Sequence, residues 1–332
     1  MAKLAKFLDK YDTVVFDMDG VVTSEQKYWT AAALTVWEKL FSSDYSVEQM
    51  AYNSLTIRKN VFCDDRIITL LKKKGVNSNW DLAYVVYAVS KIYNTTNFHE
   101  IFELCSNFGK NILDEYPVID KALTKATGVD GSRNGILWND LMMTFQSWYL
   151  GDELYQTTYN REPVNKGKTG LISDEKPVID IDDLISVFKL LSNTNKRLAI
   201  ATGRPSAELI TPIKNFGIYD CFAKDGIITY DHVQEVESMF GKTYSKPHPY
   251  VFLKAMLGED YSDNDIINGE YNHSLSRKTL IVGDAGADMF AAKEMCADFC
   301  AVLTGVEGQG SRAYFESNNA EYILDSIEDF IE

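Results

Sequence analysis

The sequence is poor in cysteine, in basic residues and in long apolar runs, and each shortage excludes a class of protein. Its five cysteines among 332 residues are scattered and form no C-x-x-C pair, which argues against a disulfide framework and favours a reducing compartment such as the cytoplasm. Lysine and arginine total 33 against 48 acidic residues, and the formal charge of -15 disfavours nucleic acid and anionic membranes as partners. No run of about eighteen apolar residues occurs, so we expect no membrane-spanning segment.

Histidine is also scarce, and this bears on the metals that the chain can bind. The four histidines stand apart from one another, and no cluster of histidine and cysteine has the spacing of zinc ligands. What the chain does contain is 45% hydrophobic and 24% charged residues, which is ordinary for a folded protein. Its length is that at which one domain usually gives way to two, so we expect two domains.

The pattern of apolar residues changes twice along the chain. Residues 25–172 carry apolar residues at helical spacing without a strand-like run, which predicts an inserted all-helical domain. Residues 1–24 and 173–332 alternate strand-like and helical segments, which predicts an α/β core with a Rossmann-like, doubly wound parallel sheet. The expected strands are residues 13–16, 198–201, 221–223, 279–282, 299–303 and 322–324. The expected last helix is residues 326–331.

Four short segments of the predicted core combine apolar residues with an acid, a hydroxyl group or a base at the end. These segments are residues 14–20, 198–204, 244–247 and 280–288. The carboxyl ends of parallel strands meet at one edge of a sheet, where α/β proteins bind their ligands. We therefore expect the polar residues of these segments to form one site.

Asp17 and Asp19 form the first acidic pair, a D-x-D tripeptide that follows the apolar run and precedes a glycine. The same tripeptide recurs at residues 180–182 and 263–265, so the spacing alone is weak evidence. A strand-end turn with two solvated acids is the alternative. In a shared site, a cation keeps one carboxylate ionised as nucleophile or ligand, while repulsion raises the proton affinity of the other for donation to a leaving group.

Further candidate ligands are Asp284, which directly follows a strand-like run, and Asp288 four residues later. Oxygen-only ligands favour Mg²⁺ over zinc. Thr202 and Gly203 stand where the second strand should end, so a hydroxyl and backbone N–H groups could hold phosphate there. Lys246 could counter negative charge on a transferred phosphoryl group. Taken one at a time, helix-capping residues and a solvated lysine are the alternatives, so the hypothesis depends on the conjunction.

In this order, the D-x-D-G, strand-Thr, Lys-Pro and G-D-x-x-x-D motifs resemble those of the haloacid dehalogenase superfamily of phosphotransferases. The resemblance covers residues 11–24 and about 173–332. It implies that Asp17 is the nucleophile that forms an aspartyl-phosphate, and that Asp19 is the general acid and then the general base. It also implies that the inserted helices are a cap of the first type, placed over the carboxyl edge of the sheet.

The resemblance further implies ligands for phosphate and for magnesium. Phosphate would be bound by Thr202, Gly203 and Lys246. Asp288 is similar to the second acid of that family's last motif, which supports the lysine or a metal-bound water. The implied magnesium site comprises Asp17, the backbone carbonyl of Asp19, Asp284 and Asp288.

The retained second acid of the first motif indicates the reaction class. Dehalogenases of this superfamily lack that acid, whereas a phosphate ester needs a proton for its leaving group, which Asp19 can supply. We therefore expect a Mg²⁺-dependent phosphomonoester hydrolase acting on a small phosphorylated metabolite. A sugar-phosphate mutase similar to β-phosphoglucomutase, or a phosphometabolite-binding protein without turnover, are the alternatives.

Overall fold

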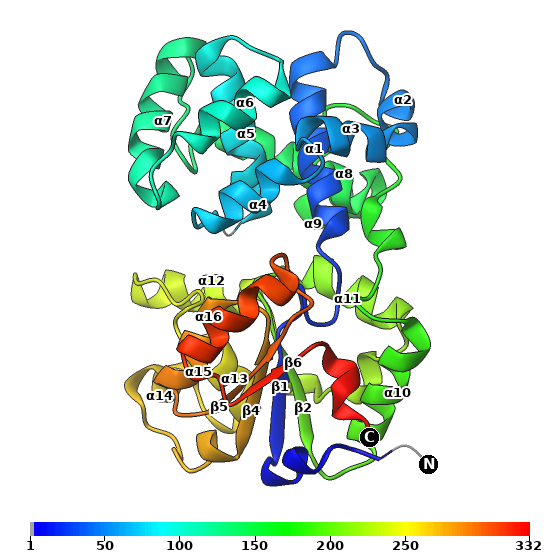
Figure 1. Ribbon diagram of the computed structural model, residues 1–332, viewed down its shortest axis with the longest axis vertical. Coiled ribbons are helices and arrows are strands. Elements are labelled where there is room, and N and C mark those ends of the chain that lie inside the picture. The colour runs from blue at the N-terminus through cyan, green and yellow to red at the C-terminus, as the bar shows by residue number, and fades with distance from the viewer. Residues whose placement is uncertain (1–2, 77) are drawn as a thin grey trace. The chain divides into compact units, whose positions relative to one another are not determined.

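The structure, a computed structural model, describes residues 3–76 and 78–332 and forms two compact units (Figure 1). One unit comprises Met1–Ser24 and Glu175–Glu332, and the other comprises Glu25–Asp174. Because the first unit uses both ends of the chain, the second unit is an insertion into it. Across the described ranges, no helix combines the length and the apolar character needed to cross a membrane.

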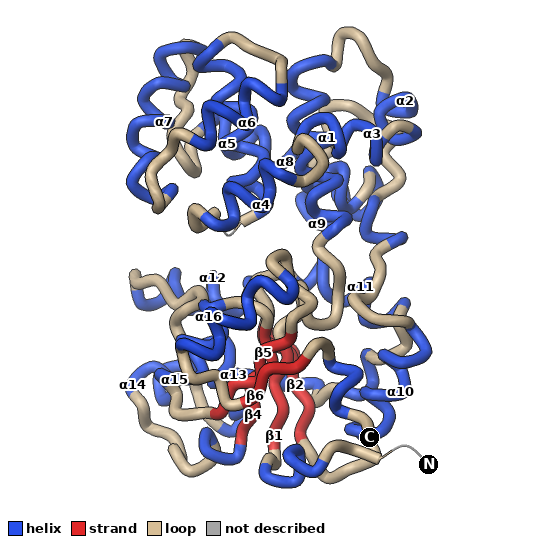
Figure 2. Tube along the Cα trace, in the orientation of Figure 1, coloured by secondary structure: helices blue, strands red, loops and turns tan. Residues whose placement is uncertain are grey.

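The first unit, the core, is built on a six-stranded parallel sheet in the order β3-β2-β1-β4-β5-β6 (Figure 2). Strand β1 lies between β2 and β4, with Phe16 opposite both Ile200 and Val282. A sheet that grows outward from its first strand in both directions is doubly wound, which confirms the predicted fold class. The strands are β1 (Thr13–Phe16), β2 (Arg197–Ala201), β3 (Ile227–Ile228), β4 (Thr279–Gly283), β5 (Asp298–Val302) and β6 (Tyr322–Leu324).

Both faces of this sheet are covered, which is why its central strands are apolar throughout. Val14 and Phe16 of β1 belong to the hydrophobic cluster on one face, and Val15 between them belongs to the cluster on the other. The first face packs against α10 (Ile181–Ser192) and α11 (Ser206–Asn215). The second face packs against α12 (Tyr230–Phe240), α13 (Tyr250–Leu257), α14 (Asp263–Asn268), α15 (Gly286–Glu294) and α16 (Arg312–Ser317).

The second unit, the insert, is helical, as its apolar spacing predicts, and its described residues contain no strand. Its core is rich in aromatic side chains, and the rings of Tyr28 and Tyr149 stack with their centroids 4.3 Å apart. Its helices are α1 (Gln26–Phe41), α2 (Val47–Tyr52), α3 (Ser54–Val61), α4 (Arg66–Lys73), α5 (Asn79–Tyr93), α6 (Phe98–Ser106), α7 (Ile112–Thr127), α8 (Ile136–Leu150) and α9 (Asp152–Tyr159).

A buried acid joins two parts of the insert. Asp81 on α5 is 4% exposed and accepts hydrogen bonds from the Trp138 indole at 2.8 Å and from Arg133 Nε at 3.2 Å. Its second oxygen pairs with Arg133 Nη2 at 2.7 Å. Because every carboxylate oxygen has a partner, this charge is tolerated inside an apolar cluster.

One expected strand of the core is wrong. Residues 221–223 are not a strand, because the chain makes 3-10 turns at Tyr219–Cys221 and Lys224–Gly226 and pairs with β2 only afterwards, as β3. This segment is too short for periodicity to distinguish one backbone form from another. The helix expected over residues 326–331 is present as a 3-10 helix at Ile327–Phe330, which begins at a Ser326 capping box.

Candidate active site

The candidate site lies where three neighbouring strands end. Asp17 directly follows β1, Thr202 follows β2 and Asp284 follows β4. The Asp17 backbone N–H donates to the Val282 carbonyl at 2.9 Å, so the pairing of β1 with β4 continues to the first acid. The parallel order β2-β1-β4 therefore brings residues from distant parts of the sequence to one edge of the sheet.

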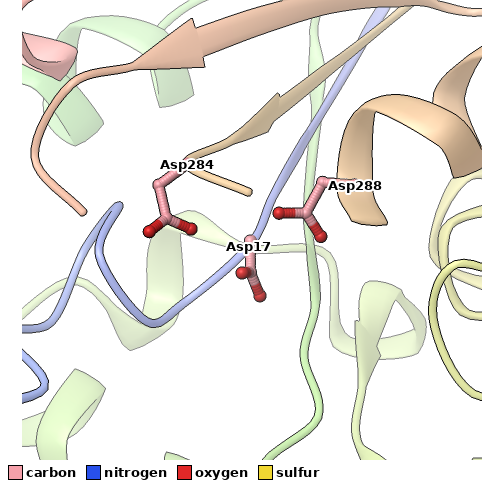
Figure 3. A group of neighbouring side chains, drawn as sticks. All are labelled: Asp17, Asp284 and Asp288. Carbon is pink, nitrogen blue, oxygen red and sulfur yellow. The ribbon is translucent and has the colours of Figure 1, made fainter. Parts of the chain in front are cut away.

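Three carboxylates meet at this edge. Asp17, Asp284 and Asp288 each offer an oxygen, and these oxygens lie within 4.8 Å of one another. Figure 3 shows the three side chains, which come from the end of β1, the end of β4 and the first turn of α15. Asp17 and Asp288 are buried, with 8% and 1% of their surface exposed. The structure thus brings together three of the four acids predicted to form the metal site.

Lys246 supplies the positive charge of this cluster. Its ammonium group lies 2.7 Å from Asp17 Oδ1 and 2.9 Å from Asp288 Oδ1, and 4.6 Å from the ring centroid of Phe252 on α13. The structure places Asp288 beside the lysine, and its predicted role, to support the lysine or a metal-bound water, stays a prediction. When all of these groups are ionised, three carboxylates and one ammonium group leave about two negative charges uncompensated. A bound divalent cation would compensate this charge.

The electrostatics of the cluster follow from its burial. The pKa of the Asp17 carboxyl is raised to about 7. Burial is the largest cause, the positive charge of Lys246 opposes it, and the charges of Asp288 and Asp19 add to the rise. For Lys246, burial favours the neutral form, but the charges of Asp17 and Asp288 outweigh it and raise its pKa above the ordinary value. The lysine therefore stays protonated, whereas burial disfavours the ionised form of Asp17.

The donor set of this cluster fits magnesium. All three residues offer carboxylate oxygens, which Mg²⁺ prefers. Asp288 Oδ2 is buried and has no hydrogen-bond partner among the described residues, although a buried carboxylate oxygen normally has one. A cation, or a water bound to it, would satisfy this oxygen.

Two glycines make room for the Asp284 carboxylate. An added Cβ at Gly20, where φ is +72°, would lie 2.4 Å from Asp284 Oδ2, and one at Gly305 would lie 1.9 Å from it. Thr304 donates a hydrogen bond to the Gly20 carbonyl and so ties the two glycine loops together. The sequence motifs did not identify Gly305 or Thr304, because they belong to the loop after β5, which carries none of the four motifs.

The Asp19 side chain lies outside the group of three acids. Both of its oxygens accept from Arg204 Nε, at 3.1 Å each, and Oδ1 also pairs with Arg204 Nη2. The side chain is 30% exposed. The predicted metal contact of Asp19 through its backbone carbonyl, and its predicted acid–base role, stay predictions.

The predicted phosphate ligands Thr202 and Gly203 lie at the end of β2. Thr202 is 1% exposed, and its hydroxyl accepts from the Arg204 backbone N–H at 3.1 Å. Gly203 is exposed, and an added Cβ would meet no atom within 4 Å. The N-cap of α11 is Pro205, so Thr202 does not cap that helix. Binding of phosphate by these residues stays a prediction.

Arg204 ends the segment of residues 198–204, but the motifs assign it no role. It is 2% exposed and makes contact with Asp19, Thr23 and Glu175. The signal in the sequence is its position, directly after the Thr-Gly pair predicted to bind phosphate. Its partners Thr23 and Glu175 gave no signal in the sequence, because neither residue directly follows a strand-like run.

Known proteins resemble the chain in sequence and fold. The family model described as haloacid dehalogenase-like hydrolase matches residues 11–295. An X-ray structure of a Northeast Structural Genomics Consortium target is 26% identical, with 96% of this chain and 97% of that chain covered and a TM-score of 0.76. Phosphatase Tt82 from Thermococcus thioreducens is 16% identical and shares the fold, with 92% and 99% covered and a TM-score of 0.51. No curated protein matches the sequence.

Proposed function

Because the chain belongs to the haloacid dehalogenase-like hydrolases, we propose that it is a magnesium-dependent phosphatase that cleaves monoesters of small phosphorylated metabolites. The observation that carries the proposal is the meeting of Asp17, Asp284 and Asp288 with Lys246 at the carboxyl edge of the sheet. A nucleophile, an oxygen-lined cation site and a fixed ammonium group are the parts that phosphoryl transfer needs.

Asp17 is the proposed nucleophile. One of its carboxylate oxygens attacks phosphorus, and the bond between phosphorus and the ester oxygen breaks as Asp19 gives its proton to the leaving oxygen. In the second step, a water attacks the phosphorus of the aspartyl-phosphate and gives a proton to Asp19. The bond between phosphorus and Asp17 then breaks, which releases inorganic phosphate and restores both side chains.

The three clustered acids are the proposed magnesium ligands, together with the backbone carbonyl of Asp19. When bound, the cation supplies charge neutralisation for the phosphoryl oxygens. Lys246 adds a fixed positive charge beside Asp17, and Thr202 and Gly203 add hydrogen-bond donors for phosphate. An anionic substrate needs such local help, because the chain as a whole carries a formal charge of -15.

The same charge supports a small metabolite, rather than nucleic acid, as the substrate. We place the protein in the cytoplasm, because its five scattered cysteines are free and suit a reducing compartment.

The test is phosphate release by purified protein from a panel of phosphorylated metabolites, with Mg²⁺ and with EDTA. The decisive variant is Asp17→Asn, which removes the nucleophile. The matched control is Asp12→Asn, the same change at an exposed residue just before the same strand. We expect release that needs Mg²⁺, survives in the control and disappears in Asp17→Asn.

Other outcomes would overturn the proposal. Equal activity of Asp17→Asn and the native protein would refute the assignment of the nucleophile. Interconversion of sugar-phosphate isomers with little free phosphate would identify a mutase. Tight binding of a phosphometabolite without turnover would identify a binding protein.

A further inference from the structure

Arg204 lies at the meeting point of the predicted proton donor and the two chain segments that connect the core to the insert. Thr23 stands just before Ser24, where the first core segment ends, and Glu175 is the first residue of the second core segment. Both contact the Arg204 guanidinium, which is 2% exposed. One buried cation therefore joins both crossings of the chain to Asp19.

The contacts use the whole guanidinium fork. Nε contacts both oxygens of Asp19 at 3.1 Å. Nη1 donates to Glu175 Oε2 at 2.9 Å, and Nη2 donates to Glu175 Oε1 at 2.7 Å and to the Thr23 hydroxyl at 2.7 Å. The Thr23 hydroxyl in turn donates to the Met18 carbonyl, which precedes Asp19. A planar fork with several donors can hold these partners at once, and a lysine cannot.

We propose that Arg204 is a positioning residue, which holds the Asp19 carboxylate in place and couples its orientation to the two crossings. The proposal rests on the proposed function, in which Asp19 gives and takes the proton. The Glu175 side chain, 1% exposed, fixes Arg204 from the side of the crossing. Asp19 is 30% exposed and has no other side-chain partner among the residues that the structure describes, so its carboxylate depends on this arginine for its orientation.

A purely structural role for the Arg204 and Glu175 pair is the rival explanation, and the leaving group separates the two. An alkyl phosphate needs a proton on its leaving oxygen, whereas dinitrophenyl phosphate has a leaving group that departs without one. A variant with a misplaced Asp19 should therefore lose activity on the alkyl ester and still form the aspartyl-phosphate from the aryl ester. A variant with a damaged fold should lose both.

The test compares Arg204→Lys with Asp19→Asn, using the full chain with Mg²⁺ on both esters. We expect Arg204→Lys to lose about 100-fold in kcat on the alkyl ester. We expect it to form phosphoenzyme from dinitrophenyl phosphate within about 10-fold of the native rate, and to accumulate it because the second step needs Asp19 as base. Rapid quenching measures the phosphoenzyme.

The matched control is Arg197→Lys, which changes an arginine paired with Asp225 at the start of β2, the strand that Arg204 follows. We expect its kinetics to match those of the native protein. If Arg204→Lys does not fold, Glu175→Gln gives the second test, because it keeps the arginine and removes one of its charged anchors. The same leaving-group selectivity, at least about 10-fold, is then expected.

An equal loss in the rate of phosphoenzyme formation from both esters, or no loss, in the folded variant would overturn the proposal. The results of the variants also show whether the proposed function or only the role of Arg204 is wrong. Activity of Asp17→Asn would refute that function. The role of Arg204 alone would be refuted by a different set of results. In that case Asp17→Asn is inactive and Asp19→Asn loses activity selectively on the alkyl ester, but Arg204→Lys shows no such selectivity.

Discussion

Replacing Lys246 with methionine tests the electrostatic account of the site. The substitution removes the ammonium group that lies 2.7 Å from Asp17 and 2.9 Å from Asp288, while it keeps an unbranched apolar side chain against Phe252. The side chains of the lysine and the two acids are only 14%, 12% and 1% exposed, so solvent compensates little of the lost charge.

The magnitude follows from this burial. A buried ion pair that loses one partner costs about 3–5 kcal/mol, because the other charge stays buried without compensation. Two carboxylates lose their partner here, but both can take up a proton, and burial already raises the pKa of Asp17 to about 7. We expect a loss at the low end of the range, about 3 kcal/mol at pH 8, and a smaller loss at pH 6. For a unit of this size, the loss lowers Tm by about 6–12 °C.

Magnesium distinguishes this explanation from a general packing defect. A divalent cation compensates the same carboxylates, so saturating Mg²⁺ should reduce the loss of Tm below that in EDTA. The assay is thermal unfolding of both proteins at pH 8, with Mg²⁺ and with EDTA. The matched control is Lys254→Met, whose ammonium group pairs with Asp263 at 3.0 Å and whose side chain is 16% exposed. Its loss of Tm should be the same with and without Mg²⁺. A loss in Lys246→Met that Mg²⁺ does not change would refute the reasoning.

Three further predictions follow from individual groups. Because Asp17, with its raised pKa of about 7, is protonated at pH 6 and ionised at pH 8, Mg²⁺ should bind about tenfold more weakly at pH 6. Titration calorimetry measures this difference, which Asp17→Asn should abolish. Gly305→Ala places a Cβ 1.9 Å from Asp284 Oδ2 and should weaken Mg²⁺ binding about 10-fold or more. In the control Gly310→Ala, the added Cβ meets no atom within 4 Å, so this variant should bind Mg²⁺ normally. Equal Mg²⁺ affinities of the two variants would contradict the inference that Gly305 makes room for the Asp284 carboxylate. Asp81→Ala leaves buried donors in the insert without an acceptor and should lower its free energy of unfolding by about 3 kcal/mol. Urea unfolding checks this value, and a change below about 1 kcal/mol would show that the pair adds little.

Several features could be predicted from the sequence because they depend on residues close together in the chain. A β-branched and aromatic run followed by an acid predicted β1 and the position of Asp17 at its end. Helical spacing of apolar residues predicted the insert, and alternating segments predicted the parallel sheet. The strand at residues 221–223 was predicted wrongly, since three residues contain too little periodicity.

The sequence by itself determined the α/β core, its helical insertion and the set of polar residues at the strand ends. Only the tertiary structure decided how those residues are used: Asp17 meets Asp284 and Asp288, Lys246 pairs with Asp17 and Asp288, and the Asp19 side chain pairs with Arg204. These contacts join residues 185 and 229 positions apart, which strand order and helix packing bring together. Local patterns report hydrophobic periodicity, whereas a charged pair depends on distance and burial, which exist only in the folded chain.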